Sequence, residues 1–378
     1  MAYITGVGDT PFGRLEGSTP LALMAQAANM ALADAGIARE AVDGLLCGYA
    51  TTLPHLMLST VFAEHYGLQP HYAHALQLGG ATGCAMVTLA RELVDAGRCR
   101  EVLVVAGENR LSGQKRDAAI QTLAQVGHPD YEVPFGATIP AYYALLASRY
   151  MHEYPVSEAD LAEFAVLMRR HAATHPGAQL KDAISVADVL ASKPIAAPLK
   201  LLDCCPISDG AVALVVSRER RDGVGVRIAG AGQAHLHQHV SSMASVSDSG
   251  ASRAAARALD EAGIRLAGID YLGIYDSFTI TLLILLEEIG IAARGTAAAR
   301  ARAGDFGVAG RLALNTHGGL LSYGHCGVAG GMAHLVEAQR QLAGHAGLRQ
   351  AGERHCALVH GDGGVLSSHV SLILSRDG

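Results

Sequence analysis

The chain has 378 residues, half of them hydrophobic, and a formal net charge of −6. A chain of this length can bury a large core and is expected to form two domain-sized units. Acidic and basic residues are interspersed, with no basic stripe to neutralise a phosphate backbone, so nucleic acid is not expected as a partner.

The N-terminal residues show neither a basic segment nor a long apolar stretch of the kind found in targeting signals. The longest apolar run, near residues 281–286, is too short to span a bilayer, so no membrane association is expected. Seven cysteines are scattered along the chain without a CxxC pair. This odd number favours reduced thiols in a cytoplasmic protein, and the spacing gives no structural metal site.

The first third of the chain alternates predicted strands and helices. Residues 2–7 predict a strand that ends in a turn at Gly8, and residues 20–35 predict a helix with a C-cap at Gly36. A buried strand at 44–49, a helix at 82–96 and an apolar strand at 101–106 follow. This order is typical of a sheet covered by helices on both faces.

The middle of the chain, from about residue 109 to about residue 206, is richer in charge, Tyr and His. It contains two predicted helices, at residues 140–154 and 158–174. The segment is longer than an ordinary connection, so we expect an inserted unit with structure of its own at about residues 110–205.

The last third of the chain repeats the first. Residues 34–43 read DAGIAREAVD and residues 261–270 read EAGIRLAGID, and each segment contains a helix end, a Gly cap and an Asp before a strand. A later helix that ends at Gly344 leads to a strand at 356–360, as the earlier helix leads to residues 101–106. This repeat predicts two similar halves, residues 1–222 and 223–378.

Four segments carry a family resemblance. They are ITGVGDTPFGR near the start, LKLLDCCPISDGAVALVVS at 199–217, YDSF at 275–278 and NTHGGLLSYGHCG at 315–327. With the repeat, they make the whole chain resemble the thiolase superfamily, in particular its sterol-carrier-protein thiolase-like branch. The resemblance implies an α/β fold with a five-layer α-β-α-β-α core of two similar halves and an inserted loop domain. It also implies a homodimer, formed at the sheet edge near residues 76–78.

The family reaction joins or splits a carbon–carbon bond next to a CoA thioester, without a cofactor. The resemblance implies that a cysteine at a helix N-terminus is acylated and that a second cysteine moves a proton at the α-carbon. A histidine and an asparagine-held water stabilise the enolate oxygen. Free N–H groups at a helix N-terminus suit this chemistry because they stabilise both a thiolate and an oxyanion.

The nucleophile motif of this branch, Cys-Ala-Thr/Ser-Gly, is replaced here by a segment that starts with Gly80. Glycine cannot be acylated, but its backbone N–H at a helix N-terminus can still bind a thioester oxygen. Cys84 lies one helical turn further on the same face. Its thiol is either a displaced nucleophile or, as the spacing favours, an inert buried side chain.

The remaining catalytic positions are also assigned by resemblance. The Gly-His-Pro motif reads Gly324-His325-Cys326, which implies substrate binding at Gly324 and an oxyanion donor at His325. The second cysteine aligns with His360, whose imidazole can move protons near neutral pH. The second oxyanion N–H aligns with Asp362.

Tyr275 replaces the asparagine that holds the water in the family site. Its hydroxyl could exchange a proton with a substrate oxygen, although a ring packed in the core is an equally good interpretation. His235, His237 and His239 would share one face of a strand, but no carboxylate lies near them in the sequence. No metal site is therefore expected.

Together these residues favour an aldol-type cleavage, in which a β-hydroxyl proton is removed and the resulting thioester enolate is held without an acyl-enzyme. One alternative is an acyl-CoA acyltransferase (a thiolase) that uses Cys84. A second is a non-catalytic subunit of a complex that binds acyl-CoA or lipid. Cysteine-less members of this branch act as aldolases with an OB-fold/zinc-ribbon partner, so the resemblance also implies a possible partner protein of that kind.

Overall fold

The computed structural model describes residues 1–136, 138–220 and 225–376. The strands are β1 Tyr3–Asp9, β2 Gly44–Gly48, β3 Tyr72–Leu76, β4 Glu101–Asn109, β5 Pro194–Ala196, β6 Leu199–Lys200, β7 Asp209–Ser217, β8 Val226–His235, β9 Tyr271–Ile274, β10 Ala313–Leu314, β11 Cys356–Gly363 and β12 Ser368–Ser375. The helices are α1 Pro20–Ala35, α2 Leu58–Tyr66, α3 Thr82–Asp95, α4 Arg116–Ala124, α5 Ile139–Glu153, α6 Glu158–Ala172, α7 Val186–Ala191, α8 Ala251–Ala262, α9 Thr279–Glu288, α10 Ala297–Arg302, α11 Gly319–Ser322 and α12 Val328–Ala343.

The strands of the two halves share one topology. The first half has the order β3-β2-β4-β7-β1, and the second has β10-β9-β11-β12-β8. Each half contributes five strands to this sheet, and β5 and β6 are not among them. When the five strands of each half are numbered along the chain, both orders read third, second, fourth, fifth, first. In both halves the first three strands of the order are parallel to one another and the last two pairings are antiparallel. The prediction of two similar halves is confirmed; the boundary between residues 222 and 223 lies outside the described residues.

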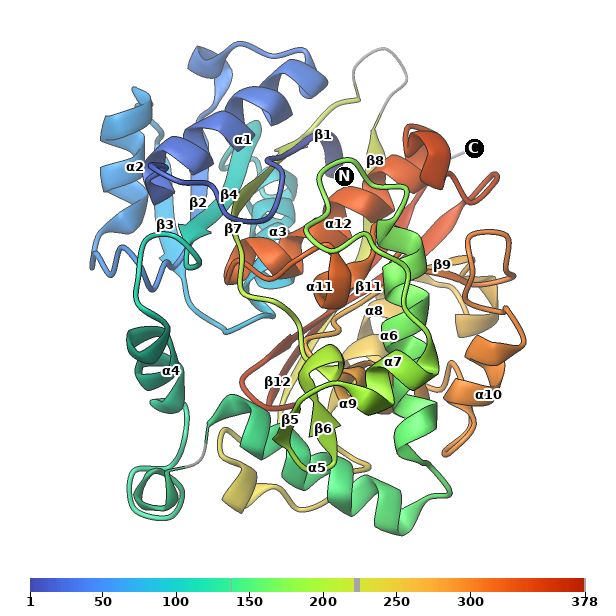
Figure 1. The fold of residues 1–378 in the computed structure, drawn as a ribbon. Helices are drawn as coiled ribbons and strands as arrows, with labels where there is room; N and C mark the ends of the chain where they lie inside the picture. Colours follow the sequence, from blue (N-terminus) through green and yellow to red (C-terminus); the bar gives the residue numbers. More distant parts are fainter. Residues whose placement is uncertain (137, 221–224, 377–378) are drawn as a thin grey trace.

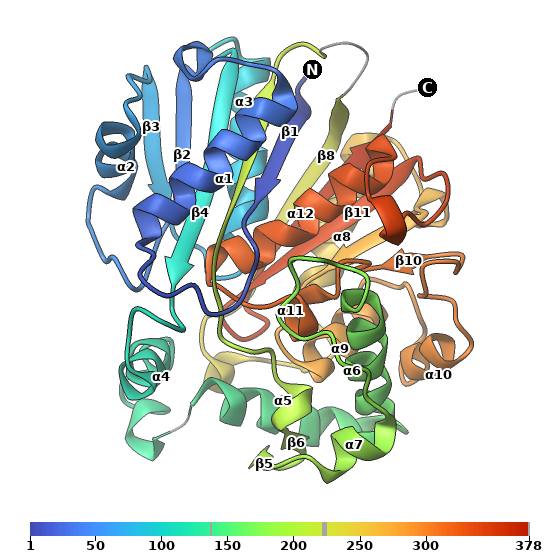
Figure 2. The same cartoon turned by 45° about the horizontal axis from the view of Figure 1, so that its top comes forward.

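The helices complete five layers (Figures 1 and 2). The helices α1 and α2 cover the outer face of the first half, and α8 and α9 lie on the outer side of the second half. Between them, α3 and α12 pack against each other and against strands of both halves. Almost every residue of α12 is buried, as expected for a helix enclosed on all sides. This arrangement confirms the predicted α-β-α-β-α core.

The sheet differs from the expectation in two details. Tyr3 and Ile4 of β1 pair with Arg227 and Val226 of β8, so the strands of both halves form one continuous ten-stranded sheet. The predicted turn at Gly8 is wrong, because Gly8 pairs with β7 and the strand continues to Asp9.

Local sequence signals explain the ends of α1. Thr19 accepts a hydrogen bond from Ala22 N–H, and Pro20 occupies the first turn, where no N–H is needed. At the other end Gly36 has φ 63°, a left-handed conformation that glycine adopts without strain. The predicted C-cap at Gly36 is therefore confirmed.

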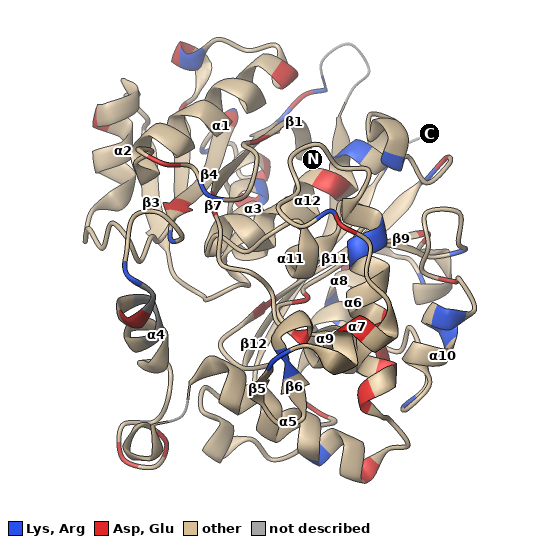
Figure 3. Cartoon of the chain, in the orientation of Figure 1, with Lys and Arg blue, Asp and Glu red and all other residues tan. Residues whose placement is uncertain are grey.

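The inserted unit runs between β4 and β7 and contains α4 to α7 and the small β5–β6 pair. Its helix α6 packs on α9, α10 and α11 of the second half, so the insertion is anchored beside the C-terminal strands (Figure 1). Lys, Arg, Asp and Glu are dispersed over the chain in Figure 3. Among the described residues, none of the helices is both long and apolar enough to cross a membrane.

A buried carboxylate joins two outer helices. Glu288, at the end of α9, accepts hydrogen bonds from the backbone N–H groups of Ser249, Gly250 and Ala251 at the start of α8, and from the Ser249 hydroxyl. These are donors that a helix N-terminus cannot satisfy internally, and the helix dipole adds to the attraction.

The variant Glu288→Ala should lose at least about 2 kcal/mol in the free energy of unfolding, because it leaves buried N–H groups without acceptors. Urea unfolding followed by circular dichroism measures the change. Glu92→Ala on the exposed side of α3 is the control and should stay within about 0.5 kcal/mol of the parent. A loss no larger than that of the control would contradict this role of Glu288.

Candidate active site

Tyr275 follows β9 and is held from both sides. Asn315 accepts a hydrogen bond from Ile274 N–H (2.8 Å) and donates one to Ile274 O (2.7 Å). The next residue, Asp276, accepts a hydrogen bond from Leu320 N–H at the start of α11 (2.7 Å). The backbone on each side of Tyr275 is therefore fixed, so its side chain projects from a rigid support.

The hydroxyl of Tyr275 lies 3.0 Å from Nε2 of His325. Gly327 N–H donates to Nδ1 of the same ring (3.2 Å), so the ring proton of neutral His325 is on Nε2 and is donated to the Tyr275 oxygen. The hydroxyl proton of Tyr275 is then not used by His325. It remains available for an oxygen of a substrate.

Gly324 places His325 in this position. It has φ 134°, and a Cβ there would lie 2.4 Å from Oγ of Ser208. That hydroxyl accepts the His325 N–H at 2.9 Å. The glycine permits both the backbone conformation and the close approach, so its contribution in the structure is to position the histidine.

The ring of Tyr275 occupies the space beside Gly80. A Cβ built on Gly80 would lie 2.3 Å from Cζ of Tyr275 and 2.4 Å from the backbone oxygen of Asp362. Neither contact is sterically possible, so a cysteine at position 80 and this orientation of Tyr275 exclude each other. The structure brings Gly80, Tyr275 and His325 together at the N-terminus of α3.

Burial keeps this pair neutral. It lowers the pKa of His325 to about 3, with the charge of Arg110 acting in the same direction. Burial also raises the pKa of Tyr275 well above its usual value, although Arg110 opposes that shift. Tyr275 is 5% exposed, whereas His325 and Gly80 keep partial exposure, so solvent reaches the site on their side.

Cys84 has the environment of an inert thiol. It is 2% exposed, and burial raises its pKa to about 12, so almost no thiolate forms at neutral pH. The sulfur faces β11, where it would lie 3.4 Å from a Cβ at Gly361. This environment favours the interpretation of Cys84 as a core residue.

His360 has different neighbours from those that its family position implies. Its ring nitrogens face Oγ of Ser371 (2.8 Å) and Nδ1 of His369 (3.1 Å), both on β12. Because side chains alternate along a strand and Gly361 faces α3, His360 lies on the other face of β11. The structure does not bring its imidazole into the Tyr275–His325 pair, and its catalytic role stays a prediction.

The Asp362 side chain lies on the same face of β11 as His360. Tyr143 of α5 donates to its carboxylate at 3.1 Å, and burial raises the pKa of this carboxyl well above its usual value. Its backbone oxygen is the atom near Gly80, so Asp362 does border the site. The predicted oxyanion role of its N–H stays a prediction.

The structure adds two residues that the sequence analysis did not select. Glu108 and Arg110, at the end of β4, form a buried ion pair, and the charge of Arg110 acts on both Tyr275 and His325. The available signal was a charged pair directly after a fully apolar strand, at the carboxyl ends of the neighbouring parallel strands β2 and β4.

Two family models match this chain. Residues 2–220 match the model described as "Thiolase, N-terminal domain", which spans more than half of the chain. Residues 232–376 match the model described as "Thiolase C-terminal domain-like".

The chain belongs to the thiolase family.

Some curated relatives of this thiolase-family chain are named for carbon–carbon cleavage and others for acetyl transfer. The chain is 33% identical to the "Steroid side-chain-cleaving aldolase" of Thermomonospora curvata, over 100% of this chain and 98% of that protein. It is 31% identical to the "17-hydroxy-3-oxo-4-pregnene-20-carboxyl-CoA lyase" of Mycobacterium tuberculosis, over 96% of each. It is 28% identical to an "Acetyl-CoA acetyltransferase" of Methanothermobacter thermautotrophicus, over 99% of each.

A solved structure, "Ltp2-ChsH2(DUF35) aldolase", matches with a TM-score of 0.85 and 32% identity, over 99% of this chain and 97% of that chain. With the family models, these relatives identify the chain as a thiolase-superfamily enzyme that acts on a carbon–carbon bond next to a CoA thioester.

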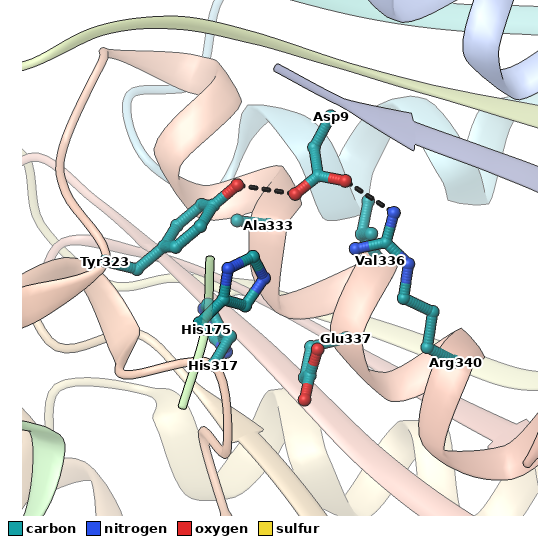
Figure 4. Close-up of a pocket in the computed structure, with 8 residues that line it drawn as sticks. All are labelled: Asp9, His175, His317, Tyr323, Ala333, Val336, Glu337 and Arg340. Carbon is teal, nitrogen blue, oxygen red and sulfur yellow. Dashed lines mark hydrogen bonds and ion pairs between the residues drawn. The ribbon is translucent and has the colours of Figure 1, made fainter. Parts of the chain in front are cut away.

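A second polar group is linked to the Tyr275–His325 pair through His334, whose ring centroid lies 6.4 Å from that of Tyr275. Figure 4 shows the side chains of Tyr323 and Arg340 directed at Asp9, with His175 and His317 beside them. The His317 ring is fully buried, 4.9 Å from the ring of His334. These groups connect α12 to β1 and to the insertion.

His175 in this group should make stability depend on pH. Burial lowers its pKa to about 4, whereas an unfolded histidine titrates near 6.5. Between pH 7 and pH 5 the unfolded chain therefore gains a proton that native His175 does not, which costs up to about 2 kcal/mol of stability. The variant His175→Gln should lose less stability than the parent over this range, as measured by urea unfolding at both pH values.

The exposed residue His152 on α5 supplies the matched control. His152→Gln should keep the pH 7 to pH 5 difference of the parent. Equal pH dependence in the parent and in His175→Gln would contradict the interpretation.

The steric exclusion at Gly80 predicts a coupling between two substitutions. Gly80→Cys should destabilise the protein by roughly 2 kcal/mol or more, because the new side chain overlaps the tyrosine ring. In a Tyr275→Asn background the same substitution should cost less, since the overlap with the ring is removed and only the close approach to the backbone oxygen of Asp362 remains. Thermal or urea unfolding of the two single variants and the double variant measures the coupling.

Gly268→Ala is the control for this cycle, since a Cβ at that position meets no atom within 4 Å. Additive effects of Gly80→Cys and Tyr275→Asn would show that the two side chains do not compete for space.

Proposed function

We propose that this thiolase-superfamily enzyme is an aldolase that cleaves the Cα–Cβ bond of a β-hydroxyacyl-CoA. The observation that carries the proposal is the position of Tyr275, whose ring fills the space of the thiolase cysteine and whose hydroxyl is paired with His325. The site thereby exchanges a nucleophile for a group that moves a proton.

The reaction can be balanced with these groups. Tyr275 is neutral in the resting site, so its hydroxyl first loses a proton to solvent. The resulting phenolate takes the proton of the β-hydroxyl, the O–H electrons form the C=O bond, and the Cα–Cβ bond breaks. The electron pair of the broken Cα–Cβ bond moves onto the thioester and forms an enolate. The proton taken from the β-hydroxyl then passes from Tyr275 to Cα. The products are a carbonyl compound and a shorter acyl-CoA, and Tyr275 is again a phenolate, which accepts the His325 Nε2–H.

The names of two relatives near 30% identity, the aldolase and the lyase, suggest the class of substrate. Both act on steroids, one by cleaving a side chain and one on a 17-hydroxy steroid with a CoA thioester. We propose a β-hydroxyacyl-CoA whose β-carbon belongs to a bulky ring system. No cofactor is required, because the thioester itself accepts the electron pair.

The thiolase alternative depends on Cys84. The acetyltransferase name of one relative supports it. The burial of the thiol and its pKa of about 12 weigh against it, because acyl transfer needs a thiolate. With 2% exposure, the sulfur is also poorly accessible to an acyl-CoA.

For the assembly we propose a homodimer and an additional subunit. The strand β3 is the last in the sheet order and is only partly buried, so its edge can face a second copy. The similar aldolase of known structure is named for two proteins, Ltp2 and ChsH2(DUF35), which supports a partner subunit here. The seven cysteines are free, and we propose a reducing, cytoplasmic compartment.

The decisive measurement uses 17-hydroxy-3-oxo-4-pregnene-20-carboxyl-CoA as the probe. Cleavage to a 17-ketosteroid and propionyl-CoA is expected, without an acyl adduct in the intact mass of the protein. Tyr275→Phe should lower kcat on the order of 100-fold or more, and His325→Ala should cost about 3 kcal/mol of transition-state stabilisation.

Cys84→Ala is the matched control for Cys84 chemistry and should keep most of the activity. An acyl adduct that disappears, together with turnover, in Cys84→Ala would replace the aldolase by a thiolase with a relocated nucleophile. The assay is run with and without a co-expressed DUF35 protein, since a missing partner would otherwise imitate an inactive site.

A further inference from the structure

Arg110 is a buried cation next to the Tyr275–His325 pair. It follows β4 directly, and the backbone beyond it is fixed because Leu111 N–H and Ser112 N–H both donate to Oδ1 of Asp209 (2.7 and 3.0 Å). Its side chain is only 6% exposed. A guanidinium is rarely buried to this extent without acceptors for its N–H groups.

The guanidinium has little polar contact with the protein. Its Nε lies 3.1 Å from Oε2 of Glu108, without the alignment of a good hydrogen bond. Over residues 1–136, 138–220 and 225–376, this ion pair is the one polar partner found for Arg110. Its two terminal amino groups therefore have donors available for another molecule.

The Glu108–Arg110 ion pair lies beside the His325 loop. A Cβ built on Gly327, whose N–H donates to His325, would lie 2.9 Å from Cδ of Glu108. The charge of Arg110 acts on Tyr275, on His325 and on Cys205. The contacts of Tyr275 with His325 and of the His325 loop with Glu108 bring the ends of β9 and β4 and the start of α12 together. Ligand oxygens that reach Tyr275 also come near this cation.

The proposed reaction needs a donor that the pair does not supply. Negative charge develops on the thioester oxygen when the Cα–Cβ bond breaks. The Nε2–H of His325, which would stabilise that charge, points at the Tyr275 oxygen. Another donor must therefore face the enolate oxygen.

We propose that Arg110 binds the thioester oxygen and stabilises the enolate that forms there. The inference rests on the proposed function. Glu108 determines which kind of ligand Arg110 can bind. Because the Glu108 carboxylate already balances the charge of Arg110, the guanidinium suits a neutral oxygen that becomes negative during the reaction. Such a donor lowers the barrier more than it tightens substrate binding.

Glu108 is held rigidly in this arrangement. It accepts hydrogen bonds from the backbone N–H and the hydroxyl of Thr51, which follows β2. The ion pair therefore fixes Nε and directs the opposite side of the guanidinium away from Glu108. A preorganised donor of this kind requires little reorganisation during the reaction.

The first test measures enolisation without carbon–carbon cleavage. Propionyl-CoA is incubated with the protein in D2O, and deuterium at Cα is followed by NMR. The parent should catalyse exchange, Arg110→Gln should exchange on the order of 100-fold more slowly, and Arg110→Lys, which keeps the charge, should lose less. In the cleavage assay kcat should fall by a similar factor in Arg110→Gln, with KM changed less than about threefold.

Arg91→Gln is the matched control, because Arg91 is a partly buried arginine of α3 that pairs with Glu261 (2.8 Å) away from the site. It should behave as the parent in both assays. Normal exchange and cleavage in Arg110→Gln overturn the inference and leave the aldolase intact. Exchange that depends on Arg110, without any cleavage, overturns the aldolase and keeps the enolate site. A parent with neither activity overturns both.

If Arg110→Gln does not fold, Arg110→Lys and Glu108→Gln decide. In Glu108→Gln, which removes the counter-charge, the rate of deuterium exchange at Cα should change severalfold or more. The urea unfolding midpoint of this variant should stay near that of Arg91→Gln. Parent-like rates in both of these variants would also overturn the inference.

Discussion

Two side chains compete for one volume at the centre of this protein. With Tyr275 in the orientation that Asn315 and Asp276 impose, no Cβ can be accommodated at Gly80. The difference from a thiolase is therefore larger than one missing nucleophile. The space is filled by a group of other chemistry, and the neighbouring histidine changes its partner from a substrate oxygen to a phenol.

The electrostatic environment follows from this exchange. A thiolase site has to stabilise a thiolate, whereas here burial keeps both Cys84 and His325 uncharged at neutral pH. The fixed charges at the pair are those of Glu108 and Arg110, which compensate each other. Such a site gives a neutral thioester little electrostatic stabilisation on binding. It stabilises mainly the negative charge that develops on the thioester oxygen during the reaction.

The sequence predicted the fold well because its signals are local. Helical periodicity, the glycine at position 36 and the repeated helix–loop–strand segment depend on short stretches of chain, and the structure contains each of them. The pairing of β1 with β8 could not be predicted, since register between distant strands depends on how the two halves pack. The motif positions of Gly80, Tyr275 and His325 were enough to bring three residues together.

The direction of side chains was the weaker part of the prediction. His360 was selected by its motif position, but strand alternation directs its ring toward β12. Arg110 was missed because nothing in one sequence distinguishes a buried arginine from the many that are solvated. Its importance appears only in the structure, where its charge acts on Tyr275 after β9 and on His325 before α12.

The position of β7 has a consequence for how the chain folds during synthesis. This strand pairs with both β1 and β4, yet it follows β4 only after an insertion of about a hundred residues. The first half cannot close its sheet until residue 217 has left the ribosome, and until then β1 and β4 expose unpaired edges. Pairings of such long sequence separation fold slowly and are prone to aggregation. A chaperone that covers these edges would therefore act mainly before the second half is made.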